Sequence, residues 1–375
     1  MFKKLVILLS FFIAAGDLHS SPIPPAPNLN VKSYVLMDYD SGMILASDNQ
    51  DLTLPPASIT KIMTAYLAFT EIKAKNINLE EEVLVSKKAW KTGGSKMFIE
   101  VGKKIKFKDI LQGVITVSGN DASVALAEHI SGDEKTFSTY MNQMASNIGL
   151  ENTNYSNATG LPNDSLYTTA EDVALLSRSL IMNFPRLYKL YSKKDFTFNE
   201  IKQYSRNKLL FVNDNVDGIK TGFTKAAGYC LASSAKRNGR RLIAVVMGAP
   251  TPEYRIQASK TLLEYGFRFF ETHKIQEKDK VISLARVFGG NKSEVGFGVS
   301  NDTFVSIPRR QKKNLKYEYI IDKGLAAPVN KDDVIGFMNI KLNNEIIHTQ
   351  KLTALEDIQQ GSFYRRTLDS LLMDL

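Results

Sequence analysis

The chain has 375 residues, 43% of them hydrophobic and 23% charged, which is enough for two globular domains. Its net charge of +9 predicts attraction to an anionic membrane or cell-wall polymer, and the absence of a nucleic-acid-binding motif argues against a nucleic-acid partner. Four scattered histidines and one cysteine, Cys230, give neither metal-ligand spacing nor an intrachain disulfide, so we expect no metal and no cofactor.

The N-terminus has the layout of a secretory signal peptide. Two lysines precede an eleven-residue apolar run, residues 5–15, and small and polar residues follow, with cleavage expected after Ser20. The run is too short to span a bilayer comfortably, although an uncleaved N-terminal anchor is the alternative. Residues 1–20 are therefore predicted to export the protein.

Helical periodicity dominates the chain up to about residue 273. Apolar residues recur at i, i+3 and i+4 over six segments: 59–72, 107–117, 122–131, 136–149, 169–181 and 258–273. Strand patterns are fewer before this point: 33–39, 43–47, 228–235 and 241–249, the last two forming a predicted hairpin. The pattern favours an α/β domain in this part of the chain.

Short strand patterns replace the helices after residue 273. They cover residues 280–288, 303–308, 316–321, 334–342 and 345–353, and Asn343-Asn344 offers a two-residue hairpin turn. We expect a small all-β domain behind the larger one.

Ser58 and Lys61 stand at the head of the first helical segment, in PPASITKIMTAY. Side chains at i and i+3 share one helix face, so the lysine can reach the serine hydroxyl. In a dry site the lysine pKa falls, and its neutral amine can accept the serine proton. The alternative is a capping serine beside a solvated lysine, and the same spacing also occurs at Ser205 and Ser233.

Two further elements follow in an order that favours the chemical interpretation. VSGND places Ser118 and Asn120 in a loop between helical segments, where an amide can hold a substrate carbonyl and a hydroxyl can relay protons. DGIKTGFT places Lys220 at the head of a K-T-G triplet before the hairpin, and we expect its charge to push Lys61 towards the neutral form. A second K-T-G at residues 91–93 is interpreted as a turn.

Taken together these stretches resemble the D-alanyl-D-alanine carboxypeptidases, the low-molecular-weight penicillin-binding proteins of peptidase family S11. YSNATGLP, FTFNEIKQYSRNKLL and LLEYGFRFFETH add to the resemblance, which runs from about residue 30 to the C-terminus. It implies a β-lactamase-like catalytic domain with an antiparallel sheet and helices over residues 28–273, and a β-rich domain over 274–360.

The resemblance also implies site residues. Ser58 would carry the acyl-ester, Lys61 would accept its proton, and Ser118 and Asn120 would complete the catalytic set. The remaining residues would bind substrate or form the oxyanion hole: Lys220, Thr221 and Gly222 of the K-T-G, Arg206 and Arg255 near the terminal carboxylate, and the backbone N–H groups of Ser58 and Thr224.

The implied reaction releases the terminal D-alanine of a peptidoglycan stem pentapeptide, a step in cell-wall biosynthesis and cell shape, and β-lactams would acylate the same serine. Transpeptidase, endopeptidase and non-hydrolysing sensor functions are alternatives. A class A β-lactamase is disfavoured because no E-x-x-L-N pattern lies between Ser118 and Lys220. Phe223 stands where some relatives have histidine after K-T-G, which leaves their histidine-dependent properties in doubt here.

The C-terminal segment 361–375 is predicted to be an amphipathic helix. One stripe contains Tyr364, Leu368, Leu371, Leu372 and Leu375, and Arg365, Arg366 and Asp369 lie off it. The resemblance implies that this helix holds the enzyme on the periplasmic face of the cytoplasmic membrane. A helix docked on the β-domain is the alternative.

Overall fold

The computed structural model describes residues 24–373 of the chain. The predicted signal peptide, residues 1–20, lies outside this range. Within residues 24–373 no helix combines the length and the hydropathy that crossing a bilayer requires.

A five-stranded antiparallel sheet with strand order β2-β1-β9-β8-β7 forms the centre of the first domain. Its strands are β1 (Ser33–Asp38), β2 (Ile44–Asp48), β7 (Val216–Thr224), β8 (Gly228–Arg237) and β9 (Arg240–Ala249). The predicted hairpin is confirmed, since β8 and β9 pair in antiparallel register from Tyr229 to Arg237.

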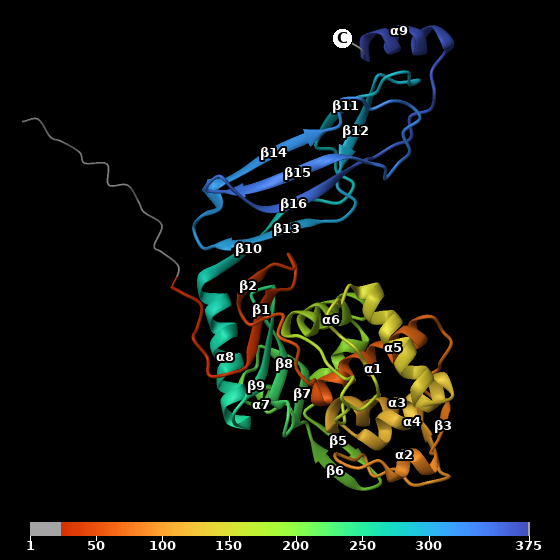
Figure 1. Cartoon of the computed structure of the whole chain (residues 1–375), viewed down its shortest axis with the longest axis vertical. Helices are drawn as coiled ribbons and strands as arrows, with labels where there is room; N and C mark the ends of the chain where they lie inside the picture. The colour runs from red at the N-terminus through yellow and green to blue at the C-terminus, as the bar shows by residue number, and fades with distance from the viewer. Residues whose placement is uncertain (1–23, 374–375) are drawn as a thin grey trace, which may run out of the picture.

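Helices cover both faces of this sheet (Figure 1), and β2 and β7 form its two edges. α8 (Pro252–Phe269) packs on one face, where Leu262 and Leu263 meet apolar residues of β1, β8 and β9. Six helices that follow β2 pack on the other face in a larger core. They are α1 (Lys61–Lys73), α2 (Lys87–Lys91), α3 (Phe107–Gln112), α4 (Asn120–Ser131), α5 (Glu134–Ile148) and α6 (Ala170–Asn183).

Smaller elements complete the helical region. They are the 3₁₀ turns η1 (Ala57–Thr60) and η3 (Leu187–Ser192), the π-helical turn η2 (Gly113–Val117), α7 (Leu209–Val212), and the strand pairs β3 (Glu82–Leu84) with β4 (Lys104–Lys106) and β5 (Asp195–Phe198) with β6 (Ile201–Tyr204). The helix predicted over 107–117 is thus α-helical only to residue 112 and ends in the π-helical turn.

The second part of the chain is made of strands, as the periodicity predicts. A five-stranded sheet has the order β11-β12-β16-β15-β14, and β10 pairs with β13. The strands are β10 (Phe270–Gln276), β11 (Ser283–Arg286), β12 (Glu294–Gly298), β13 (Thr303–Pro308), β14 (Leu315–Ile321), β15 (Val334–Leu342) and β16 (Glu345–Ala354), with the 3₁₀ turn η4 (Lys312–Asn314) before β14.

The sequence prediction was wrong at two points here. The helix predicted over 258–273 begins earlier and ends at Phe269, because the following residues pair with β13 as strand β10. β12 was missed because its sequence, EVGFG, contains two glycines that weaken the strand pattern. α9 (Phe363–Met373) lies beyond β16, at the end farthest from the helical region (Figure 1).

Candidate active site

Ser58 lies in a strained turn directly ahead of α1. The preceding residue, Ala57, has φ +48°, in the left-handed region that non-glycine residues avoid, so the surrounding structure must hold it there. Gly160 permits this packing, because any side chain at that position would collide with the Ala57 carbonyl. The turn aims the Ser58 hydroxyl into a cavity that Ser118 and Thr221 also line.

Lys61 is the first residue of α1 and is almost completely buried, with 1% exposure. Its Nζ donates to Ser58 Oγ at 3.1 Å, Asn120 Oδ1 at 2.6 Å and the Thr159 carbonyl at 2.5 Å. Burial lowers the pKa of Lys61 from 10.5 to about 7, against a smaller opposing effect of the Asp121 carboxylate. A substantial neutral fraction is therefore available near neutral pH.

Ser118 owes its position to the π-helical turn. The turn ends at Ser118, whose φ of +62° and ψ of +34° break the helix before α4 begins at Asn120. Ser118 Oγ accepts a hydrogen bond from Lys220 Nζ at 2.8 Å. Asn120 Oδ1 faces Lys61, while its Nδ2 donates to the Gly93 carbonyl at 2.7 Å.

The third element is strand β7, which runs past the Ala57–Ser58 turn. A side chain on Gly222 would lie 3.0 Å from the Pro56 carbonyl and 3.2 Å from the Ala57 Cβ, so glycine allows this close approach. Lys220 is buried with 2% exposure and donates to the Ser118 hydroxyl and to the Thr221 carbonyl.

The electrostatic relation between the two lysines differs from the expectation. Burial lowers the pKa of Lys220 well below its usual value, and the charges of Lys61, Arg255 and Arg206 lower it further. The lowered pKa of Lys61 comes from burial, and not from the charge of Lys220 as predicted.

Arg206 and Arg255 also line the Ser58 cavity, which has a volume of about 330 Å³. Arg255 donates to the Gly222 carbonyl at 3.2 Å and lies over the Tyr229 ring, with 5.6 Å between Cζ and the ring centre. Phe223 stacks on the same ring at 4.3 Å, so it closes this end of the cavity. Sequence reasoning missed Tyr229, because an aromatic in GYCLASSA also fits an ordinary strand.

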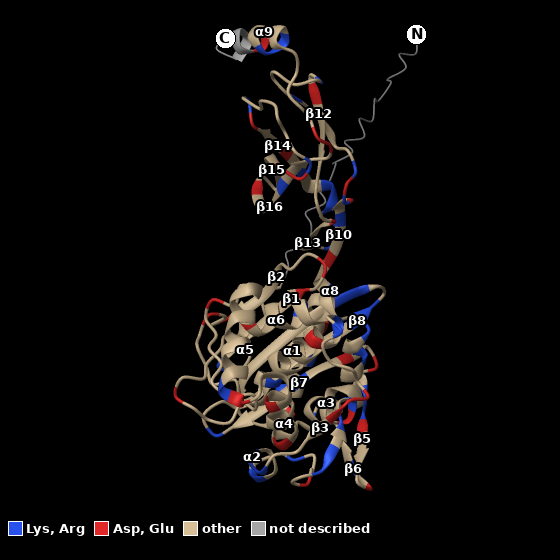
Figure 2. Ribbon diagram, turned by 90° about the vertical axis from the view of Figure 1, so that its right-hand side faces the viewer, with Lys and Arg blue, Asp and Glu red and all other residues tan. Residues whose placement is uncertain are grey.

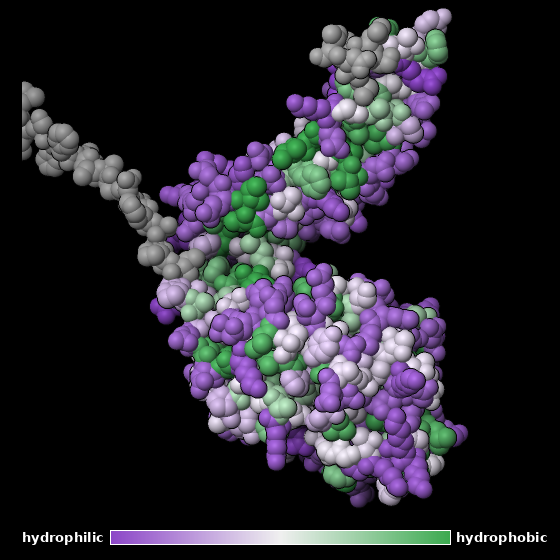
Figure 3. All heavy atoms as spheres, viewed as in Figure 1, coloured by the Kyte–Doolittle hydropathy of each residue, from purple (hydrophilic) through white to green (hydrophobic). Residues whose placement is uncertain are grey.

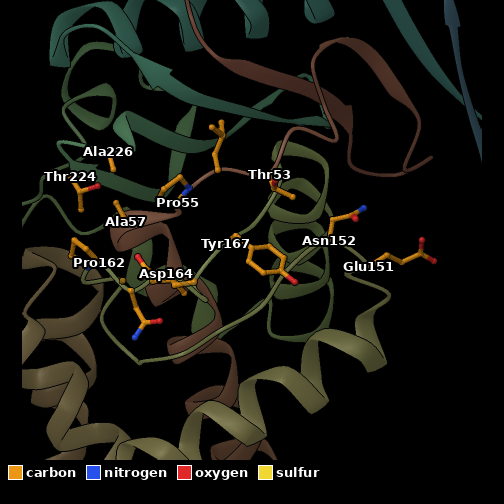
Figure 4. Close-up of a pocket in the computed structure, with 14 residues that line it drawn as sticks. Thr53, Pro55, Ala57, Glu151, Asn152, Pro162, Asp164, Tyr167, Thr224 and Ala226 are labelled. Atoms are coloured by element: carbon orange, nitrogen blue, oxygen red, sulfur yellow. The ribbon is translucent and has the colours of Figure 1, made fainter.

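Thr224 lies at the end of β7, where it lines a second, larger cavity of about 620 Å³. Figure 4 shows Thr224 and Ala57 at one side of this cavity and Pro162, Asp164 and Tyr167 of the 151–167 segment around it. The two cavities therefore adjoin at the Ala57–Ser58 turn, where Ala57 lines the larger cavity and Ser58 lines the smaller one.

The serines and lysines of the other S-x-x-K and K-T-G copies do not line the Ser58 cavity. Ser233 donates to the Ala244 carbonyl inside the sheet, and its partner Lys236 is exposed. Lys208, the partner of Ser205, is also exposed. The second K-T-G ends α2 at the surface, although its Gly93 carbonyl holds Asn120. Among residues 24–373, His, Cys, Asp and Glu side chains form no group of three that could hold a metal ion.

A helical region on an antiparallel sheet, followed by an all-β domain, is the fold of penicillin-binding protein 5. Penicillin binding protein 5 from Haemophilus influenzae superposes with a TM-score of 0.86 at 42% identity, covering 90% of this chain and all of that one. Penicillin-binding protein D2 from Listeria monocytogenes, solved in its ampicillin-bound form, superposes with a TM-score of 0.60 at 31% identity over 64% of this chain and all of that one.

The sequence comparisons specify the class more closely. The D-alanyl-D-alanine carboxypeptidase family profile matches residues 20–251, and the profile of the penicillin-binding protein 5 C-terminal domain matches residues 270–360. D-alanyl-D-alanine carboxypeptidase DacC of Escherichia coli is 42% identical over 97% of this chain and 93% of its own length. The chain belongs to the D-alanyl-D-alanine carboxypeptidase family, peptidase family S11, and is a serine-type carboxypeptidase of that class.

Proposed function

We propose that this enzyme removes the terminal D-alanine from peptidoglycan stem pentapeptides through an acyl-enzyme on Ser58. The observation that carries the proposal is Lys61: its Nζ lies 3.1 Å from Ser58 Oγ, and its pKa is lowered to about 7. A neutral amine at this distance accepts the hydroxyl proton as the oxygen attacks the carbonyl of the penultimate D-alanine.

Attack forms a tetrahedral oxyanion, for which we assign the backbone N–H groups of Ser58 and Thr224 as donors. Collapse of this intermediate breaks the peptide C–N bond and leaves the acyl group on Ser58 Oγ. The departing amine takes a proton from the Ser118 hydroxyl, to which Lys220 donates at 2.8 Å. The proton that Lys61 accepted from Ser58 returns to Ser118, which leaves Lys61 neutral again. Water then attacks the ester, Lys61 accepts its proton and passes it to Ser58 Oγ as the ester C–O bond breaks, and the shortened peptide leaves.

The two cavities suit the two ends of this substrate. The smaller cavity has Arg206 and Arg255 in its lining, with Thr221 beside Lys220, and so offers positive charge to the terminal carboxylate. The larger cavity in Figure 4 continues from Thr224 and is assigned to the acyl side of the stem peptide. A penicillin carries a similar acyl and carboxylate pair, and we assign it the same site and the same serine.

D-Alanine release from a purified pentapeptide stem tests this function. Free D-alanine and a tetrapeptide product are expected. A cross-linked product formed with an acceptor peptide would identify a transpeptidase instead, and cleavage of cross-linked dimers alone would identify an endopeptidase. Acylation by penicillin without any D-alanine release would identify a sensor.

We also propose that α9 holds the exported protein on the outer surface of the cytoplasmic membrane. Asp369 accepts a hydrogen bond from the Gly289 N–H at 2.7 Å, so the polar side of α9 contacts the β-domain. Phe363, Tyr364 and Leu368 are exposed, Tyr364 by 82%. Figure 3 shows green hydrophobic residues beside purple hydrophilic ones at the end of the molecule where α9 lies. A helix that lies in a membrane interface needs one exposed apolar side and one polar side, as α9 has.

Deleting residues 362–375 tests the membrane proposal. We expect D-alanine release to be unchanged and the protein to move from the membrane fraction to the soluble fraction. If the truncated protein still sediments with membranes after signal cleavage has been verified, the attachment lies elsewhere in the chain.

A further inference from the structure

Residues 93–99 form a strap along the Ser58 cavity, defined here as the segment between Gly93 and Ile99. It lies between α2 and β4 and has no regular secondary structure of its own, so its N–H groups need other partners. Ser95 lines the cavity, and its carbonyl accepts the Asn120 N–H at 2.7 Å. The position of the strap therefore shapes the site.

The Asp121 carboxylate supplies those missing partners. It is 1% exposed, and its Oδ1 accepts the Met97 N–H at 2.8 Å. Its Oδ2 accepts the N–H groups of Phe98 at 2.9 Å and Ile99 at 3.3 Å. Phe98 has φ +68°, a left-handed conformation that this carboxylate helps to maintain. One buried side chain thus holds three consecutive residues of the strap.

The other end of the strap fixes the side chain that touches Lys61. Asn120 Nδ2 donates to the Gly93 carbonyl, which turns Oδ1 towards Lys61 Nζ. Asn120 and Asp121 are neighbours in the first turn of α4, so one faces the proton acceptor while the next secures the strap. A strap that shifts would remove the Gly93 contact and free the Asn120 amide to rotate.

Asp121 also acts on Lys61 through charge. Asp121 of α4 is the charged group that acts on the Lys61 pKa, and Lys220 of β7 is a neighbour whose own pKa the charge of Lys61 lowers. The Asp121 carboxylate raises the Lys61 pKa, partly offsetting the lowering by burial. Removing this charge would therefore lower the Lys61 pKa further.

We propose that Asp121 is a positioning residue for acyl transfer, which holds the 93–99 strap and thereby orients Asn120 against Lys61. This inference rests on the proposed function. Misplacing a reacting group by about 1 Å can cost roughly 100-fold in rate. Asparagine in place of Asp121 keeps the size but turns an N–H group towards backbone N–H donors, so it should release the strap.

The test compares Asp121→Asn with Asp133→Asn. Asp133 is a matched control, because it also accepts backbone N–H bonds, from Lys135 and Thr136, but at the exposed start of α5. The acylation rate constant with a fluorescent penicillin is measured from pH 5 to 10, with protein folding checked by circular dichroism. Asp121→Asn should acylate about 10- to 100-fold more slowly. The acidic limb of its pH–rate profile should also move to lower pH. Asp133→Asn should match the wild type.

Wild-type acylation within error for folded Asp121→Asn, or slower acylation with an unmoved acidic limb, would overturn the inference. If Asp121→Asn does not fold, Gly94→Ala carries the test, since a Cβ at Gly94 would lie 2.6 Å from Asn120 Nδ2. That variant should also acylate at least about tenfold more slowly, and an unchanged rate would contradict the inference. A wild-type protein that is not acylated at all would refute the proposed function itself.

Discussion

The two K-T-G triplets have the same letters in very different surroundings. Lys220 lies in strand β7 with 2% exposure and donates to the Ser118 hydroxyl at 2.8 Å. Lys91 is the last residue of α2 and is exposed, on a lysine-bearing part of the surface (Figure 2). Thr92 bonds back to the Lys88 carbonyl, as in an ordinary helix end, whereas Thr221 lines the Ser58 cavity.

Burial, more than residue identity, lowers the pKa of a lysine in this protein. A solvated ammonium keeps its proton, but Lys61 and Lys220 pay a desolvation penalty that lowers both pKa values. The second triplet still matters through its backbone, since Gly93 holds Asn120. A motif search alone cannot separate these two kinds of contribution.

The largest expected effect comes from removing the proton acceptor. Lys61→Ala should slow acylation by penicillin by about 100- to 10,000-fold, because a general base typically supplies that much. Lys208→Ala and Lys236→Ala are matched controls with the same S-x-x-K spacing but exposed lysines, and both should acylate normally. Near-normal acylation of folded Lys61→Ala would mean that another group takes the proton.

A direct test of the comparison removes one lysine from each triplet. Lys220→Ala should lower kcat/KM for D-alanine release by roughly 100-fold, because Ser118 loses the hydrogen bond that Lys220 Nζ donates at 2.8 Å. Lys91→Ala should stay within about twofold, as for a surface change. The opposite ranking would show that the cleft has been placed at the wrong triplet.

The smallest of the expected effects is the change of the acylation rate with pH near neutrality. With a Lys61 pKa of about 7, the acylation rate should fall about tenfold per pH unit below that value and level off above it. The rate falls at low pH because the neutral amine of Lys61 is the active form and protonation removes it. A rate that keeps rising towards pH 10 would contradict the lowered pKa of Lys61.

Much of the fold and of the Ser58 site could be predicted from the sequence, because the local hydrophobic pattern and the order of the motifs agreed. The i, i+3 spacing of Ser58 and Lys61 at a helix start correctly predicted that the two side chains meet, at 3.1 Å. The change from helical to strand periodicity near residue 273 also predicted where the all-β part of the chain begins.

The rest depended on contacts between distant residues. Lys61 reaches the Thr159 carbonyl, and Asp121 reaches the strap, across separations that no local pattern encodes. The end of α8 at Phe269 depends on pairing with β13, and the π-helical turn before Ser118 carries no periodicity signal of its own. Tertiary contacts decide such features.

The most direct test of the central claim is to locate the acyl group. The protein is incubated with benzylpenicillin, digested and mapped by mass spectrometry, alongside Ser58→Ala, Ser205→Ala and Ser233→Ala. We predict one penicilloyl adduct, on Ser58, which is lost only in Ser58→Ala. An adduct that persists in folded Ser58→Ala, or that maps to another serine, would contradict the account.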